Sequence, residues 1–304
     1  MTSLEHISNR LSDYFALLKP RVMSLVIFTV IVGMFLAPGE LGLVMSIVSI
    51  ISVAVGAGAA GAINMWYDRD MDAQMQRTMH RPLPSGRLKP IEALLTGIIL
   101  SIASVAGLAL WANYLSATLL AVTILYYVII YTIWLKRRTP QNVVIGGVSG
   151  ALPPVIGWTT VTGSIDLIAV FLFLVIFLWT PPHSWALAIL KQDDYSAASV
   201  PMLPVTSGRR STALQIGIYS FLLVPTTLLP LLLDFSGWLY AIVAILLGIR
   251  FLLHSCRLIQ VLGKPAIKTL DIDRARILFI HSIRYLFLIF LALVIDKIIP
   301  IPFM

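Results

Sequence analysis

The sequence predicts an all-α fold, a polytopic membrane protein of about nine transmembrane helices in which two four-helix halves and a final helix surround a central cavity. Three observations predict it. Apolar residues make up 59% of the chain, well above the roughly 45–50% that is typical of soluble domains. Charged residues fall mostly between long apolar runs. Two polar loops also resemble each other, as the loops of repeated halves would.

The apolar runs are long enough to cross a bilayer, which takes about 20 residues. They follow one another along the whole chain, so we expect residues 1–304 to form one integral membrane domain. The predicted spans begin near residues 22, 43, 91, 115, 141, 167, 213, 236 and 277.

Basic residues gather in every second connection between these runs, beginning with the segment before the first run. By the positive-inside rule, these connections and the N-terminus lie in the cytoplasm, and the C-terminus lies in the periplasm. Topology therefore accounts for the net charge of +8 without nucleic acid as a partner. The short polar N-terminus favours a bacterial inner membrane, and the lone Cys256 excludes a disulfide.

The two similar loops are residues 83–87, which read Leu-Pro-Ser-Gly-Arg, and residues 203–209, which read Leu-Pro-Val-Thr-Ser-Gly-Arg. Each follows an acidic helix end, and four predicted helices separate them. This spacing suggests two parallel halves with a site between them on the cytoplasmic side. Chance also produces matches as short as this one.

Helix-breaking residues occur inside two predicted spans, at Pro153-Pro154 and at Pro181-Pro182. Such breaks are tolerated where the freed backbone is buried in protein or lines a cavity. Ordinary kinking and close helix packing explain them equally well.

Asn64, Asp68 and Asp72 recur at every fourth position where the second span ends, so they share one helix face. Three stacked oxygen side chains beside the bilayer are costly unless a cation neutralises them. Mg²⁺ fits, because it binds one or two carboxylates and completes its shell with water and phosphate oxygens. The alternative is a solvated helix end with its charges paired to Arg69 or Arg77.

Basic side chains near this face are candidates for binding a diphosphate, because guanidinium groups hold phosphate in a bidentate manner. Each of them also lies in a connection that the positive-inside rule expects to be basic, and this rule is the simpler explanation for any single residue. The candidates are Lys19, Arg21, Arg77, Arg81, Lys191 and Arg209.

His183 lies inside the sixth span beside the Pro181-Pro182 break. An ionisable residue at this depth is a functional candidate, although a neutral histidine bonded to a freed carbonyl is an equal alternative. Aromatic side chains in the same spans are candidates to line an apolar pocket and stabilise a cation, or else serve as ordinary packing. They are Trp66, Tyr67, Trp158, Trp179 and Trp185.

Characteristic segments follow in order along the chain, namely Asn64–Asp72, Arg77-Thr78, Arg81–Pro84, His183–Trp185, Lys191–Tyr195 and Pro201–Pro204. Across essentially the whole chain they resemble the intramembrane aromatic prenyltransferase (UbiA-type) superfamily, and within it the branch that farnesylates haem b. The resemblance implies a nine-helix fold and transfer of a farnesyl group from farnesyl diphosphate to a vinyl group of haem b, with water supplying a hydroxyl group. A haem A synthase or terminal oxidase assembly proteins are the partners it implies.

The resemblance also assigns roles to residues. Asn64, Asp68 and Asp72 would hold Mg²⁺ and act in catalysis together with Lys191, and Arg77, Arg81 and Lys191 would bind the diphosphate. The other three basic residues are candidates for the same role because of their positions near the acidic face. His183 is a candidate to contact haem because of its position inside the sixth span.

One departure from the wider superfamily concerns the second Asp-x-x-x-Asp motif, because residues 191–195 here read Lys-Gln-Asp-Asp-Tyr. We therefore expect Lys191 to replace part of the charge of a second Mg²⁺, with Asp194 as the remaining acidic metal ligand.

Two other functions are weighed against this one. A prenyltransferase for another aromatic acceptor, such as 4-hydroxybenzoate, would favour the paired second motif that is missing here. A secondary transporter would also show repeats and broken helices, but its ionisable groups would lie near the bilayer midplane. Those of this chain crowd the predicted cytoplasmic helix ends.

Overall fold

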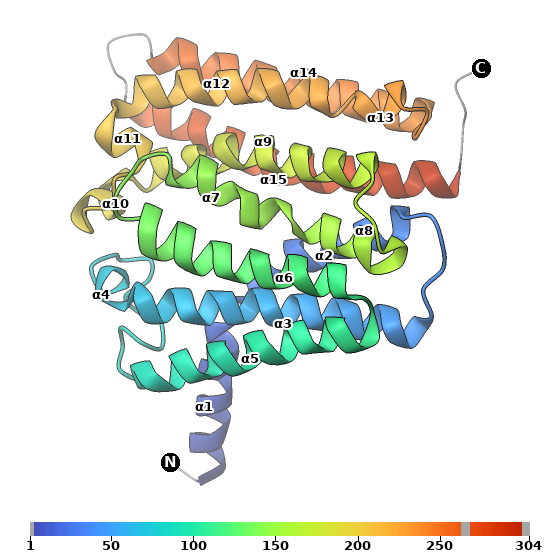
Figure 1. Ribbon diagram of the computed structural model, residues 1–304. Helices are drawn as coiled ribbons and strands as arrows, with labels where there is room; N and C mark the ends of the chain where they lie inside the picture. The colour runs from blue at the N-terminus through green and yellow to red at the C-terminus, as the bar shows by residue number, and fades with distance from the viewer. Residues whose placement is uncertain (1–2, 263–267, 300–304) are drawn as a thin grey trace.

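The computed structural model describes residues 3–262 and 268–299, and within these ranges all regular structure is helical. Figure 1 shows the long helices side by side, with their connections gathered at the two ends of the bundle. No strand occurs in the described part of the chain. The all-α prediction is confirmed.

Eight elements are long and apolar enough to cross a membrane, and a bent pair raises the number to nine. This agrees with the predicted spans. The eight are α3 (Leu43–Tyr67), α5 (Pro90–Trp111), α6 (Tyr114–Leu125) continued by η1 (Tyr126–Leu135), α7 (Asn142–Ala151) with α8 (Pro153–Thr162), α9 (Leu167–Leu190), α12 (Gly208–Thr226) with α13 (Leu229–Leu232), α14 (Trp238–Leu262) and α15 (Lys268–Ile298).

The bent pair comprises α1 (Ser3–Leu17) and α2 (Pro20–Leu36), whose axes differ by 56° across the break. Lys19 occupies the break with a positive φ of 52°, and Pro20 begins α2. Proline at a first helical position forfeits only an N–H that has no helical partner there. The break therefore brings the Lys19 side chain into the bundle instead of continuing α1.

The interior helices approach closely where glycines remove side chains. A Cβ on Gly157 of α8 would come within 2.2 Å of the Val30 carbonyl oxygen of α2, and one on Gly33 would meet the Pro154 carbonyl oxygen at 2.1 Å. Small residues at such crossings let membrane helices pack by backbone contact. The close packing of α2 against α8 therefore requires glycine at both positions.

The prolines have two different effects. Pro153 begins α8, so the fifth span is divided at Leu152 into α7 and α8. Pro181 and Pro182 lie inside α9 without ending it. The predicted break is therefore present in the fifth span, and the sixth span remains one helix.

Three short helices lie together at one end of the bundle (Figure 1), namely α4 (Arg69–Asp72), α10 (Gln192–Ala197) and α11 (Leu203–Thr206). α4 lies shortly before residues 83–87, and α11 lies within residues 203–209, so the two connections that contain the similar segments are at the same end of the bundle, as predicted. Elsewhere in the bundle, α2 contacts α15, and the ring of Phe28 packs on that of Phe287 with centroids 4.8 Å apart. This contact joins the first and last spans.

Candidate active site

The predicted acidic face forms at the junction of α3 and α4. Asn64 lies in the last turn of α3, Asp68 ends that helix, and Asp72 ends α4. All three are buried, with exposed fractions of 3%, 0% and 2%. The alternative of a solvated helix end is therefore wrong, and the basic partners of the two acids are Lys136 and Arg81 instead of Arg69 or Arg77.

Asn64 organises this face through three side chains. Its Nδ2 donates to Asp68 Oδ2 at 2.8 Å and to Thr132 Oγ1 at 3.0 Å. Its Oδ1 accepts a hydrogen bond from Lys19 Nζ at 2.6 Å. The amide thus connects α3 with η1 and with the break between α1 and α2.

Asp68 is paired with a lysine that sequence analysis did not single out. Lys136 Nζ donates to Asp68 Oδ2, and Arg137 Nη2 lies 3.7 Å from Asp68 Oδ1. Asp68 Oδ1 is buried and accepts no hydrogen bond. A buried carboxylate oxygen without a donor is costly, so this atom is available to a further cation.

Asp72 is paired with Arg81, one of the residues predicted to bind a diphosphate. Arg81 Nη1 donates to Asp72 Oδ2 at 2.6 Å, and Thr78 Oγ1 donates to the Asp72 carbonyl oxygen at 2.9 Å. The loop after α4 therefore folds back over the acidic face.

Asp70 lies outside this arrangement, because it is two residues away from Asp68 and Asp72 in the sequence and off their shared face. Its side chain is exposed and accepts hydrogen bonds from Arg137 Nη1 and Nη2 at 2.9 and 2.6 Å. These bonds lower the pKa of the Asp70 carboxyl to about 2.

The conformation of η1 explains why Lys136 reaches the acidic face. η1 is a π-helix, in which hydrogen bonds join residues five apart, and the Lys136 N–H donates to the Tyr131 carbonyl at 2.9 Å. The wider turn places Tyr127, Tyr131 and Lys136 along one lining surface. Tyr127 and Tyr131 are four residues apart and would share one face of an α-helix, but Lys136 follows Tyr131 by five residues and would not. The π-helical turn is therefore what aligns Lys136 with the two tyrosines, and the α-helical period does not predict it.

A polar pocket of about 150 Å³ lies between these groups. Five of the predicted residues, Asn64, Asp72, Lys19, Arg77 and Arg81, line it. Its other lining residues are Met75, Tyr127, Tyr131, Lys136, Tyr195, Val200 and Met202.

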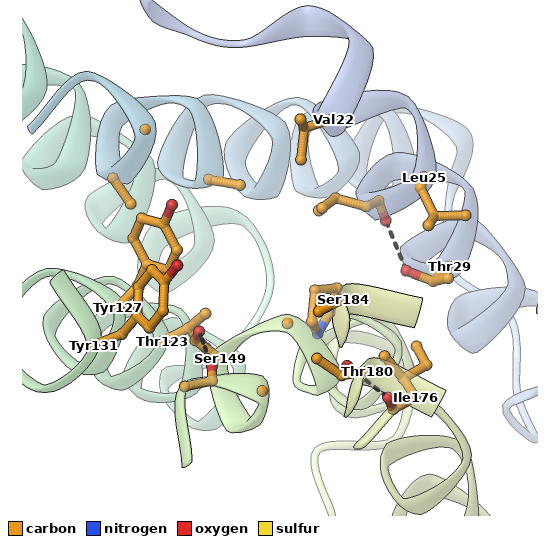
Figure 2. A pocket seen from close by; sticks show the side chains of 18 of the residues that line it. Val22, Leu25, Thr29, Thr123, Tyr127, Tyr131, Ser149, Ile176, Thr180 and Ser184 are labelled. Carbon is orange, nitrogen blue, oxygen red and sulfur yellow. Dashed lines mark hydrogen bonds between the residues drawn. The ribbon is translucent and has the colours of Figure 1, made fainter. Parts of the chain in front are cut away.

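A larger and mostly apolar cavity of about 430 Å³ adjoins the polar pocket. Lys19, Tyr127, Tyr131, Tyr195 and Met202 line both, so the two spaces share a boundary. Figure 2 shows Tyr127 and Tyr131 on one side of the cavity, opposite α2, with residues of α9 below. A central cavity is therefore present, as predicted.

Glycines shape the wall of this cavity. A Cβ on Gly146 would lie 2.3 Å from the Tyr131 ring, and one on Gly147 would lie 3.2 Å from the Thr180 methyl group. The Tyr131 ring therefore packs flat against α7 in a position that requires glycine.

His183 lines the apolar cavity between two aromatic rings, with centroids 4.2 Å from Trp179 and 4.8 Å from Phe279. The Ser282 hydroxyl donates to the Phe279 carbonyl at 2.7 Å, so it accepts from His183 Nδ1 at 2.8 Å. This network assigns the proton to Nδ1 and leaves a lone pair on Nε2. In the described part of the chain no group bonds to Nε2.

Other predicted residues lie outside the two spaces. Lys191 ends α9, Asp194 lies on α10, and Arg209 donates to Gln192 Oε1 at 2.6 Å, and none of the three lines either space. The side chain of Arg21 lies outside the described residues. Of the five candidate aromatic residues, Trp179 alone lines the cavity, and Trp185 is a fully buried core residue.

The donor set fits a magnesium ion. The described chain contains no group of three or more His, Cys, Asp or Glu side chains suited to a metal. Asn64, Asp68 and Asp72 instead offer one amide and two carboxylates, and Asp68 Oδ1 lacks any donor. Such hard oxygen donors suit Mg²⁺, which completes its shell with phosphate and water oxygens.

Comparison with known sequences identifies a protein family and several relatives that this chain resembles. The sequence profile of the UbiA prenyltransferase family matches residues 26–283. The chain is 50% identical to protoheme IX farnesyltransferase 2 of Mesorhizobium japonicum, over 98% of its own length and 95% of that protein. It is 53% identical to the protoheme IX farnesyltransferase of Rhizobium etli, over 94% and 89% of the two lengths.

Solved structures share the fold. A digeranylgeranylglyceryl phosphate synthase matches with a TM-score of 0.77 at 21% identity, covering 95% of this chain and 99% of that one. A UbiA homolog from Archaeoglobus fulgidus bound to DMAPP and Mg²⁺ matches with a TM-score of 0.63 at 15% identity, covering 90% and 99%. Since the profile match spans most of the sequence and the helices adopt the same arrangement, the chain belongs to the UbiA prenyltransferase family.

Proposed function

We propose that this protein transfers the farnesyl group of farnesyl diphosphate to a vinyl group of haem b. One water molecule supplies the new hydroxyl, and the products are haem O and diphosphate. The observation that carries the proposal is the polar, cation-lined pocket that adjoins an apolar cavity containing His183. The names of relatives at about half identity support the choice of substrates.

The polar pocket suits the diphosphate end of the donor. Arg77, Arg81, Lys19 and Lys136 line it and supply positive charge for the phosphate oxygens. Lys136 and Arg81 neutralise Asp68 and Asp72 in the described structure, and each can exchange that carboxylate for a phosphate oxygen nearby.

Asn64, Asp68 and Asp72 would hold Mg²⁺, with Asp68 Oδ1 as the free donor. When bound, Mg²⁺ stabilises the negative charge that develops on the departing diphosphate. The neighbouring arginines and lysines stabilise the same charge from the protein side.

The apolar cavity suits the isoprenoid chain and the porphyrin. Tyr127 and Tyr131 stand at the boundary with the polar pocket, where the carbon that loses diphosphate becomes an allylic cation. Aromatic faces stabilise such a cation, and the cavity keeps bulk water away from it. The cation then forms a bond to the terminal vinyl carbon, which leaves the positive charge on the vinyl carbon next to the porphyrin ring. One water molecule adds to that carbon and releases a proton, which gives the hydroxyl group.

His183 is proposed to contact haem through iron. Its Nδ1 proton is held by Ser282, so Nε2 has the free lone pair that an axial ligand needs. Unchanged haem absorption in a His183→Ala variant would contradict this role.

Lys191, Arg209 and Asp194 are kept as secondary proposals. Lys191 would supply part of the charge of a second metal, Arg209 would bind diphosphate, and Asp194 would be an additional ligand. Lys136 serves the charge-compensating role more directly, because it contacts Asp68. Full activity of Lys191→Ala together with loss of activity in Lys136→Ala would assign that role to Lys136.

The cellular setting follows from topology. We place the protein in the bacterial inner membrane, with its N-terminus and the polar pocket on the cytoplasmic side and its C-terminus in the periplasm. A haem A synthase or a terminal oxidase assembly protein would receive the product.

The decisive experiment incubates the purified protein in detergent with farnesyl diphosphate, Mg²⁺ and haem b, beside an Asp68→Ala control. Extracted haems are then examined by mass spectrometry. Haem O from the parent and none from the control is the expected result. Folded parent protein that yields no haem O, but prenylates 4-hydroxybenzoate, would overturn the proposed acceptor.

A further inference from the structure

Two arginines are exposed halfway along the last two spans. Arg250 lies at the middle of the 25-residue span Trp238–Leu262, and Arg284 lies at the middle of the 29-residue span Leu270–Ile298. At 1.5 Å per residue, each stands about 18–21 Å from the ends of its span. Arginine at such depth is costly unless something neutralises or solvates it.

The two arginines belong to a larger group of basic side chains, here called the α14–α15 basic cluster. His254 of α14 and His281 of α15 meet edge to face, with ring centroids 5.0 Å apart. Arg250 interacts electrostatically with both histidines. The members are Arg250, His254 and Arg257 on α14, and Arg274, His281 and Arg284 on α15.

The described protein supplies no counter-ion to this cluster. Residues 3–262 and 268–299 contain no ion pair that involves any of its four arginines. Arg274 Nε is buried without a hydrogen-bond partner, and the nearby Asp271 and Asp273 pair with none of the arginines. Asp271 Oδ1 is also buried without a hydrogen-bond partner, so the acids of this chain lie beside the cluster without forming ion pairs with it, and its guanidinium groups are open to an anionic group of another molecule.

The surroundings of the cluster are apolar and exposed. Leu246, Ile249 and Leu253 flank it on α14, and Ile280 and Ile283 flank it on α15. Figure 1 shows α14 at the edge of the bundle, where lipid would meet it. A ligand that covers both features needs an anionic group attached to apolar chains.

We propose that the α14–α15 basic cluster binds the phosphate headgroup of an anionic phospholipid. Figure 1 shows the end of α14 and the start of α15 at the end of the bundle that carries α10 and α11. By their positions in the sequence, Arg257 and Arg274 are nearer that end than Arg250 and Arg284, so the arginines descend from that surface into the bilayer. The headgroup sits among the guanidinium groups, which bind phosphate in a bidentate manner, and the acyl chains lie along the flanking apolar residues. Basic pockets between cytoplasmic helix ends bind anionic lipids in this way.

Native mass spectrometry of the full-length protein in detergent tests the proposal. Phosphatidylglycerol and phosphatidylcholine with identical acyl chains are titrated onto the parent and onto Arg250→Gln/Arg284→Gln. The matched control is Arg138→Gln/Arg210→Gln, which removes two exposed arginines elsewhere. We expect the parent and the control to prefer phosphatidylglycerol, and the test variant to bind it about 30-fold more weakly, at roughly a fivefold effect per basic side chain.

A second measurement uses only the parent protein, so its result does not depend on whether a variant folds. Phosphatidylglycerol with a photoreactive headgroup is crosslinked to the unmodified parent, and peptides of α14 and α15 should carry the label. Equal phosphatidylglycerol affinity in the parent and the test variant would overturn the proposal. So would labelling confined to other helices, displacement of the lipid by an equal concentration of inorganic phosphate, or a parent without lipid preference that binds an acidic transmembrane peptide instead.

Discussion

Lys136→Met removes the cation that donates to Asp68 while keeping a side chain of similar length. Asp68 is fully buried, and its other cationic neighbour, Arg137, lies 3.7 Å away without a hydrogen bond. Breaking a buried pair from one side costs about 3–5 kcal/mol, because the remaining charge is uncompensated. Arg137 stays nearby, so we expect the lower limit, a loss of about 3 kcal/mol in the free energy of unfolding.

Thermal unfolding in detergent without divalent ions measures this loss. One kcal/mol corresponds to roughly 2–4 °C in a protein of comparable size, so the expected fall in Tm is about 6–12 °C. Lys136→Met combined with Asp68→Asn removes both charges and should recover most of it. Lys136→Arg keeps the charge and serves as the matched control.

Magnesium provides the second arm of the experiment. A ligand that binds only the folded state raises its stability, and loss of the competing Lys136 ammonium leaves Asp68 free for the ion. Lys136→Met should therefore gain more in Tm from MgCl₂ than the parent does, and Asp68→Asn should gain less. A Lys136→Met variant with the parental Tm and the parental response to MgCl₂ would refute the assignment of this pair.

Other predictions concern packing, pH and haem. Gly157→Ala should lower thermal stability by about 1–3 kcal/mol, because its Cβ would meet an α2 carbonyl at 2.2 Å, and Gly150→Ala, with no atom within 4 Å, should not. Asp70→Asn should leave the activity profile between about pH 5 and 8 unchanged. The pKa of the Asp70 carboxyl is lowered from 3.8 to about 2, so the stability that its ionised form contributes is lost only as pH falls towards 2. A difference between the two profiles in that range would contradict this. Ser282→Ala should weaken and shift the absorption of bound haem, because His183 Nδ1 loses its 2.8 Å partner, and an unchanged spectrum would exclude that bond from haem binding.

The spans and the acidic face could be predicted because each depends on a local pattern. Apolar runs of span length have no other stable location, so their positions agree with the helices of the structure. The spacing of Asn64, Asp68 and Asp72 matches the α-helical period of α3, and their burial on one face follows from it.

The rest of the site depends on conformations that sequence patterns do not specify. Lys136 reaches it because η1 adopts π-helical hydrogen bonds, and nothing in an apolar run of aromatic residues distinguishes that conformation from an α-helix. Lys19 was a candidate by its charge, but its burial requires the break before Pro20. Lys191 matched a family position, yet the end of α9 places it away from both lining surfaces.

The balance of charge around the polar pocket connects stability with substrate binding. The pocket is lined by four basic residues, Lys19, Arg77, Arg81 and Lys136, and by one acidic residue, Asp72. Asp68 is connected to the pocket through its hydrogen bond with Asn64, so basic side chains outnumber carboxylates. Without substrate, two of the cations neutralise the acids, which makes burial of the carboxylates tolerable. In the proposed function, a bound diphosphate would give the same cations phosphate oxygens as alternative partners, and the carboxylates would then be available to Mg²⁺. An excess of fixed positive charge also reduces the need for a second metal, in keeping with residues 191–195, where the paired acidic motif is absent.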